Sequence, residues 1–351
     1  MRPFIVTTLL VAIGSLPVQR AKAAVAGPGA ADSPADHLPP YITRLTAFGE
    51  RADWSPDGRK ILFLSKTFGD AMELDLATKA IRSLTAGYPH HGYTRALYLA
   101  NGDILLSGPE TFDPKHPDQA RRHCYLYVLG QSLSKPAAPL GVLCSEGPAV
   151  SRRRLHIAWT EWSESATAPP TNSVIYEADV VYDNGVPKLA NRRTVIDRHA
   201  LPFPCTIETQ NFRPPEEKEL TFSAYNLPGT ESDVCSVNLE TQAVTNYTHS
   251  PDIYDEVEGI YPDGQYTLVE CDQQNRQGPG HIDLWKLKLD GSGQYRRLTF
   301  FSDYPGYKAS NPVVSDDGQF IAFQMGQARD SAGVGHGLFL YDIKKAVANG
   351  H

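Results

Sequence analysis

A repeated sequence unit places the strongest constraint on the fold of this chain. The stretch "WSPDGRKILFLS" (54–65) places an Asp-Gly turn between an aromatic residue and an alternating apolar run. Two further copies are "IYPDGQYTLVE" (260–270) and "VVSDDGQFIAFQ" (313–324). Asp-Gly is favoured in tight hairpins because the turn needs a positive φ, which glycine adopts without steric cost. Each copy is therefore predicted to be a β-hairpin, and their repetition predicts an array of similar units.

The sequence after each hairpin supplies further strands. In the first and fifth units, a third strand ends near an aspartate and a short turn leads to a fourth strand closing on Leu-Thr. With these units as anchors, weaker copies bring the total to six units, beginning near residues 50, 94, 146, 208, 256 and 310. Consecutive four-stranded units of this length are typical of β-propellers. The sequence therefore predicts an all-β fold, a six-bladed β-propeller of four-stranded antiparallel blades.

The last unit lacks its fourth strand. It stops after "LFLYDI" (338–343), whereas "YITRLTAF" (41–48), ahead of the first unit, carries the missing Leu-Thr ending. We expect this N-terminal strand to complete the last blade and close the ring, because closure removes the exposed edges of an open sheet. The propeller is predicted to span residues 41–351 as a single domain.

The N-terminal residues predict export from the cytoplasm. Residues 1–23 combine a positive residue, a short apolar core and an Ala-Lys-Ala cleavage pattern, which together indicate a signal peptide; an uncleaved anchor is the alternative. Residues 24–40, rich in Ala, Pro, Gly and Asp, are expected to form a flexible leader. No long apolar run follows, so the protein is expected to be periplasmic or secreted and not membrane-spanning.

The chain contains five cysteines, which in an oxidising compartment allow at most two internal bridges. Cys124 and Cys144 lie on two adjacent predicted strands, and folding these strands back about Ser134 sets the cysteines opposite each other. We therefore predict a disulfide between them. The pairing of Cys205, Cys235 and Cys271 stays open, and buried thiols are the alternative for all five.

Aligning the six inner strands on the turn shows a column of polar residues at one expected mouth of the channel. Five residues before the turn, the column holds Glu50, Thr94, Glu146, Glu208, Glu256 and Ser310. Two residues further along each strand, on the same face, lie Ala52, Ala96, Pro148, Gln210, Glu258 and Pro312. Several carboxylates would thus ring the mouth. Crowded carboxylates repel one another unless they share a proton, bind a cation or meet cationic groups.

Basic and amide side chains near this column complete the predicted ligand site. The cationic candidates are Arg51, His90, His91, Arg95, Arg213 and Lys308. The predicted ligand-binding set is Glu50, His90, His91, Arg95, Glu146, Glu208, Gln210, Asn211, Glu256, Glu258, Lys308 and Asn311. A divalent cation is one expected occupant, although no strong zinc motif occurs, and catalytic and metal-binding residues are not assigned. Alternatively, each glutamate caps backbone amides or pairs with a neighbouring blade.

The repeat "WSPDGRKILFLS", followed by "ELDLATKAIRSLT" (73–85), resembles the blade repeat of TolB-type propellers, which bacteria export to the periplasm. The resemblance covers the first, fifth and sixth units well and the others loosely. It implies the architecture and is nearly silent about function, because unrelated activities occur on one propeller fold.

Two functions are predicted. The first is an exported TolB-like binding or scaffold module for an envelope component, protein, peptide or saccharide, at the channel mouth. The alternative is a metal-assisted carbohydrate-active enzyme, a lyase or hydrolase, because oligogalacturonate lyases resemble TolB-type propellers with a metal in the channel. This chain has histidines at 90, 91, 281 and 336 but lacks the closely spaced ligand pair expected of those lyases. A net charge of −7 and a pI near 5.9 argue against nucleic acid, and a monomer is expected.

Overall fold

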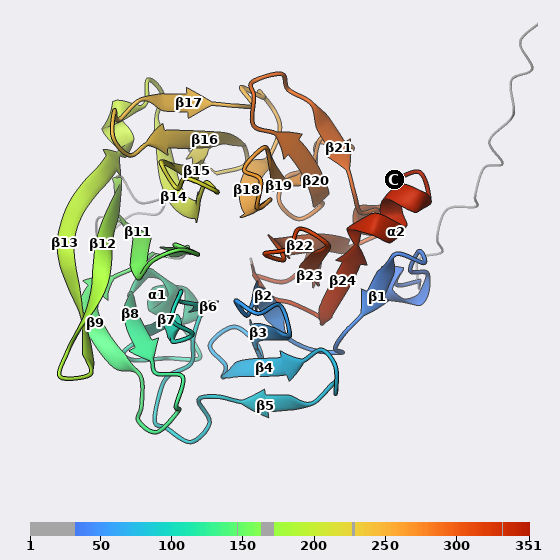
Figure 1. Ribbon diagram of the computed structural model, residues 1–351. Coiled ribbons are helices and arrows are strands. Elements are labelled where there is room, and N and C mark those ends of the chain that lie inside the picture. The colour runs from blue at the N-terminus through green and yellow to red at the C-terminus, as the bar shows by residue number, and fades with distance from the viewer. Residues whose placement is uncertain (1–31, 146, 163–171, 227–228, 332) are drawn as a thin grey trace, which may run out of the picture.

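The computed structural model describes residues 32–145, 147–162, 172–226, 229–331 and 333–351. Six four-stranded antiparallel sheets surround a central axis, as Figure 1 shows. This arrangement confirms the predicted six-bladed β-propeller. Each inner strand begins within three residues of the start predicted for its unit. The predicted signal peptide lies outside the described residues.

Each blade runs from an inner strand at the axis to an outer strand at the rim. Blade 1 consists of β2 (Glu50–Trp54), β3 (Lys60–Leu64), β4 (Ala71–Asp75) and β5 (Ile81–Ser83). Blade 2 consists of β6 (Arg95–Tyr98), β7 (Ile104–Pro109), β8 (Cys124–Leu129) and β9 (Ala138–Leu143). Blade 3 consists of β10 (Ala149–Val150), β11 (His156–Trp162), β12 (Ser173–Asp183) and β13 (Val186–Asp197).

The second half of the ring repeats this plan. Blade 4 consists of β14 (Cys205–Phe212), β15 (Glu219–Asn226), β16 (Ser232–Asn238) and β17 (Val244–Asn246). Blade 5 consists of β18 (Asp255–Ile260), β19 (Tyr266–Cys271), β20 (Asp283–Lys288) and β21 (Tyr295–Arg297). Blade 6 consists of β22 (Tyr307–Val314), β23 (Phe320–Gln327), β24 (Leu338–Asp342) and the N-terminal β1 (Ile42–Arg44).

The pairing of β1 with β24 closes the ring, as predicted. The two strands are antiparallel, with Ile42 opposite Tyr341. Asp342 donates its backbone N–H to the Tyr41 carbonyl and Leu45 donates to the Leu338 carbonyl, both at 2.8 Å. Tyr41 and Ile42 are buried in the core of blade 6. The chain ends are thus fastened to each other through one sheet.

The end of the predicted leader is ordered against blade 6. Residues 34–36 form the short helix η1 (Pro34–Asp36), and Ser33 caps it by accepting from the Ala35 N–H. Ala35 and Leu38 pack against the core shared by blades 5 and 6, and the His37 ring stacks on Tyr304 with centroids 6.0 Å apart. Contact with the propeller therefore begins ahead of residue 41.

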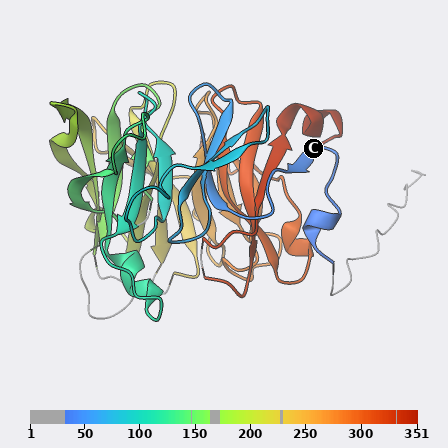
Figure 2. The ribbon, with the colours of Figure 1, turned by 90° about the horizontal axis from the view of Figure 1, so that it is seen from below.

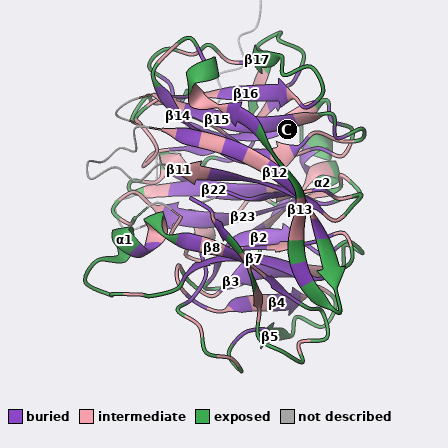
Figure 3. Ribbon diagram, turned by 90° about the vertical axis from the view of Figure 1, so that its left-hand side faces the viewer, coloured by how far each residue is buried: buried purple, intermediate pink, exposed green. Residues whose placement is uncertain are grey.

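Six hydrophobic clusters hold the blades together, one at each interface between neighbouring blades. In the cluster between blades 6 and 1, for example, Trp54 and Phe63 pack with Leu338. The inner and middle strands are accordingly buried, whereas β13 and the outer loops are exposed (Figure 3). Each blade depends on both neighbours for its core, so an open ring would expose two apolar faces.

Helices are few and short. Besides η1, the described residues form α1 (Pro117–Arg122), η2 (Arg198–Ala200), η3 (Phe301–Asp303) and α2 (Ile343–Ala348). The helix α1 interrupts the connection between β7 and β8 and projects from one face of the ring (Figure 2). Over the described part of the chain, no helix has the length and apolar character needed to cross a membrane.

Cys124 and Cys144 lie opposite each other on β8 and just beyond β9, as the sequence predicts, with the Cys144 N–H donating to the Cys124 carbonyl at 2.8 Å. Both side chains are buried, and the disulfide between them stays a prediction. The Cys124 sulfur lies 3.5 Å from the Ala120 carbonyl oxygen and accepts from the Thr94 hydroxyl at 3.6 Å. Cys205, Cys235 and Cys271 are buried thiols.

Ring closure can be tested by a pair of proline substitutions in β1. The backbones of Tyr41 and Leu45 form hydrogen bonds with β24. Hydrogen-bonded positions alternate along an antiparallel edge strand, so the Thr43 N–H also points toward β24, whereas the Arg44 N–H points away from the sheet. Thr43→Pro removes a ladder donor and leaves a β24 carbonyl unpaired, which should lower the free energy of unfolding by about 1–3 kcal/mol. Arg44→Pro is the matched control. Thermal unfolding at equal temperatures for the two variants would contradict closure by β1.

Candidate functional site

The axial channel contains two chambers that meet at Arg95. The first, of about 260 Å³, lies at the N-terminal ends of the inner strands; we call it the charged chamber. The second, of about 280 Å³, lies at the ends that lead into the hairpin turns; we call it the turn-side chamber. Asn311 lines the charged chamber and donates through Nδ2 to Oε1 of Glu258, which lines the turn-side chamber, at 3.2 Å.

β-Bulges shape the wall of the charged chamber. Register shifts interrupt four inner strands at a similar level, between Glu50 and Asp53, Thr209 and Asn211, Val257 and Ile260, and Ser310 and Val313. A bulge bends a strand and re-aims its side chains. At two of these bulges a residue with a side chain adopts positive φ, 54° at Arg51 and 47° at Asn311. The local backbone thus turns polar side chains toward the axis.

A recurring hydrogen bond fixes these inner strands to the preceding blade. The inner-strand N–H beside the bulge donates to the fifth residue of the second strand of that blade. The bonds are Arg51 to Gln324 (2.6 Å), Asn311 to Glu270 (2.5 Å), Val257 to Ser223 (3.0 Å) and Thr209 to Thr160 (2.9 Å). These side chains of the second strands therefore lie near the axis, beside the inner strands.

One wall of the charged chamber is cationic. It is formed by side chains from blades 6, 1 and 2 and from helix α1, namely Lys308, Arg51, Arg95 and Arg121. Lys308 is 7% exposed, and its ammonium donates to the Pro279 carbonyl at 3.0 Å. Arg95 approaches Glu258 no closer than 4.0 Å. A neutral carbonyl and a distant carboxylate leave much of the positive charge of these two groups uncompensated.

The opposite wall is acidic and phenolic. It is formed by side chains from blades 4 and 5, namely Glu208, Tyr225, Tyr254, Glu256 and Glu270. The Tyr225 hydroxyl lies 2.7 Å from Oε1 of Glu256 and 3.2 Å from Oε2 of Glu208, and the Tyr254 hydroxyl donates to Oε2 of Glu256. Burial and the adjacent carboxylates raise the pKa of both tyrosines well above the usual range. Both phenols therefore keep their protons.

Two carboxyl groups near the junction of the chambers hold their protons more tightly than usual. Burial raises the pKa of Glu270 to about 8, and the charge of Glu256 adds to this effect, whereas Lys308 and the Asn311 N–H oppose it. Burial likewise raises the pKa of Glu258, against the opposing charge of Arg95. At neutral pH Glu270 is therefore mostly a carboxylic acid and adds little negative charge to the acidic wall.

The structure brings most of the predicted inner-strand residues to the channel. Arg95, Glu208, Glu256, Lys308 and Asn311 line the charged chamber, and Gln210, Asn211 and Glu258 line the turn-side chamber. Asn211 is held by a hydrogen bond from its Nδ2 to the Glu258 carbonyl. Glu146 lies outside the described residues.

Glu50 does not line either chamber, which corrects its predicted role in the site. Its carboxylate is fully buried and accepts from the Thr67 hydroxyl at 2.6 Å and from the Gly335 N–H at 2.9 Å. Burial raises its pKa despite these donors and Arg51. Glu50 thus ties two loops to β2, in agreement with the alternative that such glutamates cap backbone amides.

His90 and His91 lie apart from both chambers, in a cleft between blades 1 and 2, so their predicted place at the channel mouth is wrong. The connection from β5 to β6 carries them. His90 stacks on Tyr93 and lies 3.1 Å from a carboxylate oxygen of Asp70, and its Nδ1 accepts from the Gly92 N–H. Arg213 also lies elsewhere, where it pairs with Glu219 at 2.9 Å.

Alignment of the inner strands did not identify four charged or phenolic residues of the charged chamber. Tyr225 and Glu270 belong to second strands, Tyr254 precedes β18, and Arg121 belongs to α1. Glu270 is the fifth residue of its second strand, and the polar residues Thr160, Ser223 and Gln324 occupy the same position in other blades. An alignment of the second strands would therefore have identified Glu270. No comparable pattern indicates Arg121, because α1 is an insertion in one blade.

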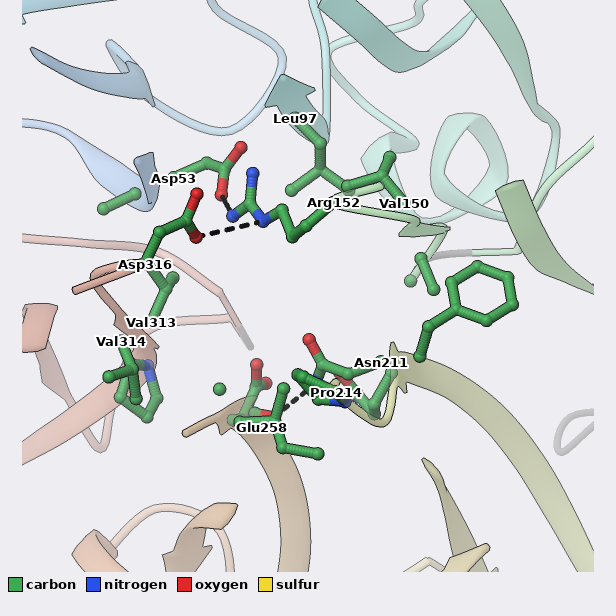
Figure 4. Close-up of a pocket in the computed structure, with 18 of the residues that line it drawn as sticks. Asp53, Leu97, Val150, Arg152, Asn211, Pro214, Glu258, Val313, Val314 and Asp316 are labelled. Atoms are coloured by element: carbon green, nitrogen blue, oxygen red, sulfur yellow. Dashed lines mark hydrogen bonds and ion pairs between the residues drawn. The ribbon is translucent and has the colours of Figure 1, made fainter. Parts of the chain in front are cut away.

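The turn-side chamber differs in chemistry. Apolar side chains such as Leu97, Val150 and Val313 form much of its wall (Figure 4). At its mouth Arg152 of blade 3 reaches across to Asp53 of blade 1 at 2.6 Å and Asp316 of blade 6 at 3.6 Å (Figure 4). The guanidinium therefore joins three blades and narrows this end of the channel.

The predicted divalent cation has no recognisable ligand set in the described ranges. Within them, no group of three or more histidine, cysteine, aspartate or glutamate side chains is arranged to hold a metal ion. The acidic wall instead relieves the repulsion between its carboxylates through phenol donors, a protonated Glu270 and the facing cations.

Two solved oligogalacturonate lyase structures have a similar fold. The oligogalacturonate lyase of Vibrio parahaemolyticus is 12% identical, with a TM-score of 0.50 over 85% of this chain and 79% of the lyase. An oligogalacturonate lyase in complex with manganese is 14% identical, with a TM-score of 0.51 over 87% of this chain and 81% of the lyase. TolB of Acinetobacter baumannii is 12% identical, with a TM-score of 0.48 over 86% of this chain and 63% of TolB. No protein-family model and no curated protein sequence matches the chain.

The proton held by Glu270 predicts a pH-dependent stability. The unfolded chain releases this proton near pH 4.5, whereas the folded protein keeps it to about pH 8. The folded state therefore binds an extra proton between these values, and the free energy of unfolding falls as the pH rises across this window. In Glu270→Gln the amide mimics the protonated acid and still accepts from Asn311. Between pH 5 and 8.5 the Tm of the parent should fall by about 2–4 °C more than that of the variant.

The exposed Glu240, which lies 3.5 Å from Lys218, provides the control substitution, Glu240→Gln. This variant should keep the pH profile of the parent. Identical profiles for the parent and Glu270→Gln would show that Glu270 is ionised throughout the range.

Proposed function

We propose that this protein is an exported binding module that captures an acidic saccharide of the cell envelope in the charged chamber. The observation that carries the proposal is the separation of charge in the chamber. A cationic wall from blades 6, 1 and 2 faces a wall of carboxyls and phenols from blades 4 and 5. A ligand that carries both an anionic group and several hydroxyls is complementary to such a pair of walls.

The cationic wall supports the choice of an acidic ligand. Lys308 and Arg95 are largely buried, and among the described residues neither makes a short ion pair with a carboxylate. A ligand carboxylate would supply the charge-assisted hydrogen bonds that a buried cation needs. Protonation of Glu270 at neutral pH removes one negative charge from the chamber, which further favours an anion.

The acidic wall supports the choice of a saccharide rather than a simple anion. Carboxylate oxygens accept hydrogen bonds from sugar hydroxyls, and tyrosine rings offer flat apolar surface beside a polar tip. Ser310 Oγ and Asn311 Oδ1, both buried at the chamber wall, have no hydrogen-bond partner among the described residues. A polyhydroxy ligand can donate to or accept from both atoms.

The size of the chamber limits the bound portion of the ligand. A volume of about 260 Å³ falls below the range of roughly 300–1,000 Å³ usual for ligand pockets. The chamber is therefore suited to a single sugar ring at the end of a longer chain. Residues 1–23 carry the signal-peptide pattern that supports action outside the cytoplasm.

Isothermal titration calorimetry with D-galacturonic and D-glucuronic acid tests this function. At least one acid should bind, and the corresponding neutral sugar should bind at least tenfold more weakly, because it lacks the carboxylate that faces the cationic wall. Lys308→Met should weaken binding of the acid by about tenfold or more, since it removes a charge-assisted hydrogen bond.

The control variant is Lys188→Met, because Lys188 is exposed and pairs only with Asp183 at 2.6 Å on the β12–β13 hairpin. It should bind the acid as the parent does. Equal affinity for acidic and neutral sugars, or no binding of either, would contradict the proposed function.

A further inference from the structure

Tyr225 occupies a distinctive position in the acidic wall. Its hydroxyl lies within hydrogen-bond distance of two carboxyl groups, at 2.7 Å from Glu256 and 3.2 Å from Glu208. A phenol has one proton and can donate it fully to only one of them. The side chain is half-buried and lines the charged chamber. The structure thus places a hydroxyl nucleophile beside two proton acceptors, the arrangement used to activate weak nucleophiles.

The same chamber contains a group able to donate a proton. Glu270 lines the chamber, and one of its oxygens accepts from the Asn311 N–H at 2.5 Å, which orients the carboxyl group. Burial keeps this carboxyl group protonated at neutral pH. An oriented carboxylic acid of this kind is what glycoside cleavage requires to protonate the leaving oxygen.

We propose that the charged chamber hydrolyses a glycosidic bond of the acidic saccharide that it binds, with Tyr225 as the nucleophile, Glu256 as its general base and Glu270 as the general acid. This activity rests on the proposed function, because the cationic wall would orient the sugar through its carboxylate. Tyrosine serves as the nucleophile in some glycosidases, so the chemistry has a precedent.

In the first step, Tyr225 Oη bonds to the anomeric carbon and its proton passes to Glu256. The bond from the anomeric carbon to the leaving oxygen breaks, and that oxygen takes the proton of Glu270. The surrounding carboxylates oppose an isolated phenolate, so the proton must leave as the new bond forms. The same carboxylates, Glu208 and Glu256, stabilise the positive charge that develops on the sugar ring.

In the second step, water attacks the anomeric carbon of the glycosyl-tyrosine and gives a proton to the Glu270 carboxylate. The phenolate oxygen leaves and recovers its proton from Glu256. One water is consumed, one glycosidic bond is cleaved, and all three side chains return to their starting states. No metal ion takes part in either step, which distinguishes this reaction from metal-assisted cleavage.

The test uses the full-length protein with 4-nitrophenyl glycosides of glucuronic, galacturonic and N-acetylneuraminic acid, and measures release of 4-nitrophenol with and without chelator. At least one glycoside should be cleaved, at the same rate with chelator. Tyr225→Phe should lose on the order of 100-fold or more in kcat while still binding the free acid in calorimetry. Tyr304→Phe, on a loop away from the chamber, should keep the activity of the parent.

The role of Glu270 has its own readout. Glu270→Gln should still release 4-nitrophenol in a rapid burst, because this leaving group needs little protonation, but then turn over slowly, because water attack uses the Glu270 carboxylate as its base. On the methyl glycosides the variant should lose activity without a burst. A glycosyl fluoride of the cleaved sugar with a second fluorine on the carbon next to the anomeric carbon should trap the intermediate, with the added mass on the peptide that contains Tyr225.

Three results would overturn the hydrolytic role. They are binding of the acids without release of nitrophenol from any glycoside, full activity of a folded Tyr225→Phe variant, or a trapped label on Glu208 or Glu256. In the first case the binding function stands and hydrolysis does not. Absence of binding to any acidic sugar would instead reject the proposed function together with this inference.

Discussion

The hydrogen bond between an inner-strand N–H and a second-strand side chain of the preceding blade is the interaction on which the channel depends. It recurs at Arg51, Thr209, Val257 and Asn311, each beside a bulge. A bulge leaves a backbone donor outside the regular ladder, and a buried donor without a partner costs free energy. Neighbouring blades supply the acceptor, so the bulges and the packing of the ring stabilise each other. At Asn311 the acceptor is Glu270, and the same bond therefore orients a carboxyl group that lines the charged chamber.

The ring explains how so many charged groups are buried together. A charge removed from water is tolerated when hydrogen bonds or opposite charges replace the lost solvation. In the charged chamber, two phenols donate to Glu256, Glu270 keeps its proton, and Lys308 donates to a carbonyl. Such an arrangement contributes little to stability compared with the apolar clusters between blades. Its residues are better explained by ligand recognition, because perturbed carboxyl groups in a cavity are typical of functional sites.

Much of the fold could be predicted from the sequence because the residues that specify each hairpin lie close together in the chain and recur in several units. Asp57-Gly58 and its equivalents mark hairpins directly, and the Leu-Thr ending at residues 45–46 identifies the strand that closes the ring. The same alignment placed Glu208 and Glu256 at the axis, since equivalent residues of a repeat occupy equivalent positions. It misplaced Glu50, because the direction of that side chain depends on a bulge, on the loop of the same blade that carries Thr67, and on a loop near Gly335 that is distant in the sequence. His90 and His91 lie in a connection whose path no repeat specifies.

The two chambers divide the channel into ends of different character, and this division favours the charged chamber as the reactive one. At the turn side, the guanidinium of Arg152 is engaged with Asp53 and Asp316, so the main charges there neutralise one another across the mouth. In the charged chamber, unlike charges lie on opposite walls with an open volume between them. A paired charge stabilises the ring. Charges that the scaffold holds apart instead create an electrostatic field in the space between them, and this field can stabilise a ligand or a transition state. The propeller produces the second arrangement because apolar clusters between neighbouring blades fix the inner strands around the axis. The fixed strands keep the cationic side chains of blades 6, 1 and 2 and the acidic side chains of blades 4 and 5 on their own walls, so that Arg95 comes no closer than 4.0 Å to Glu258.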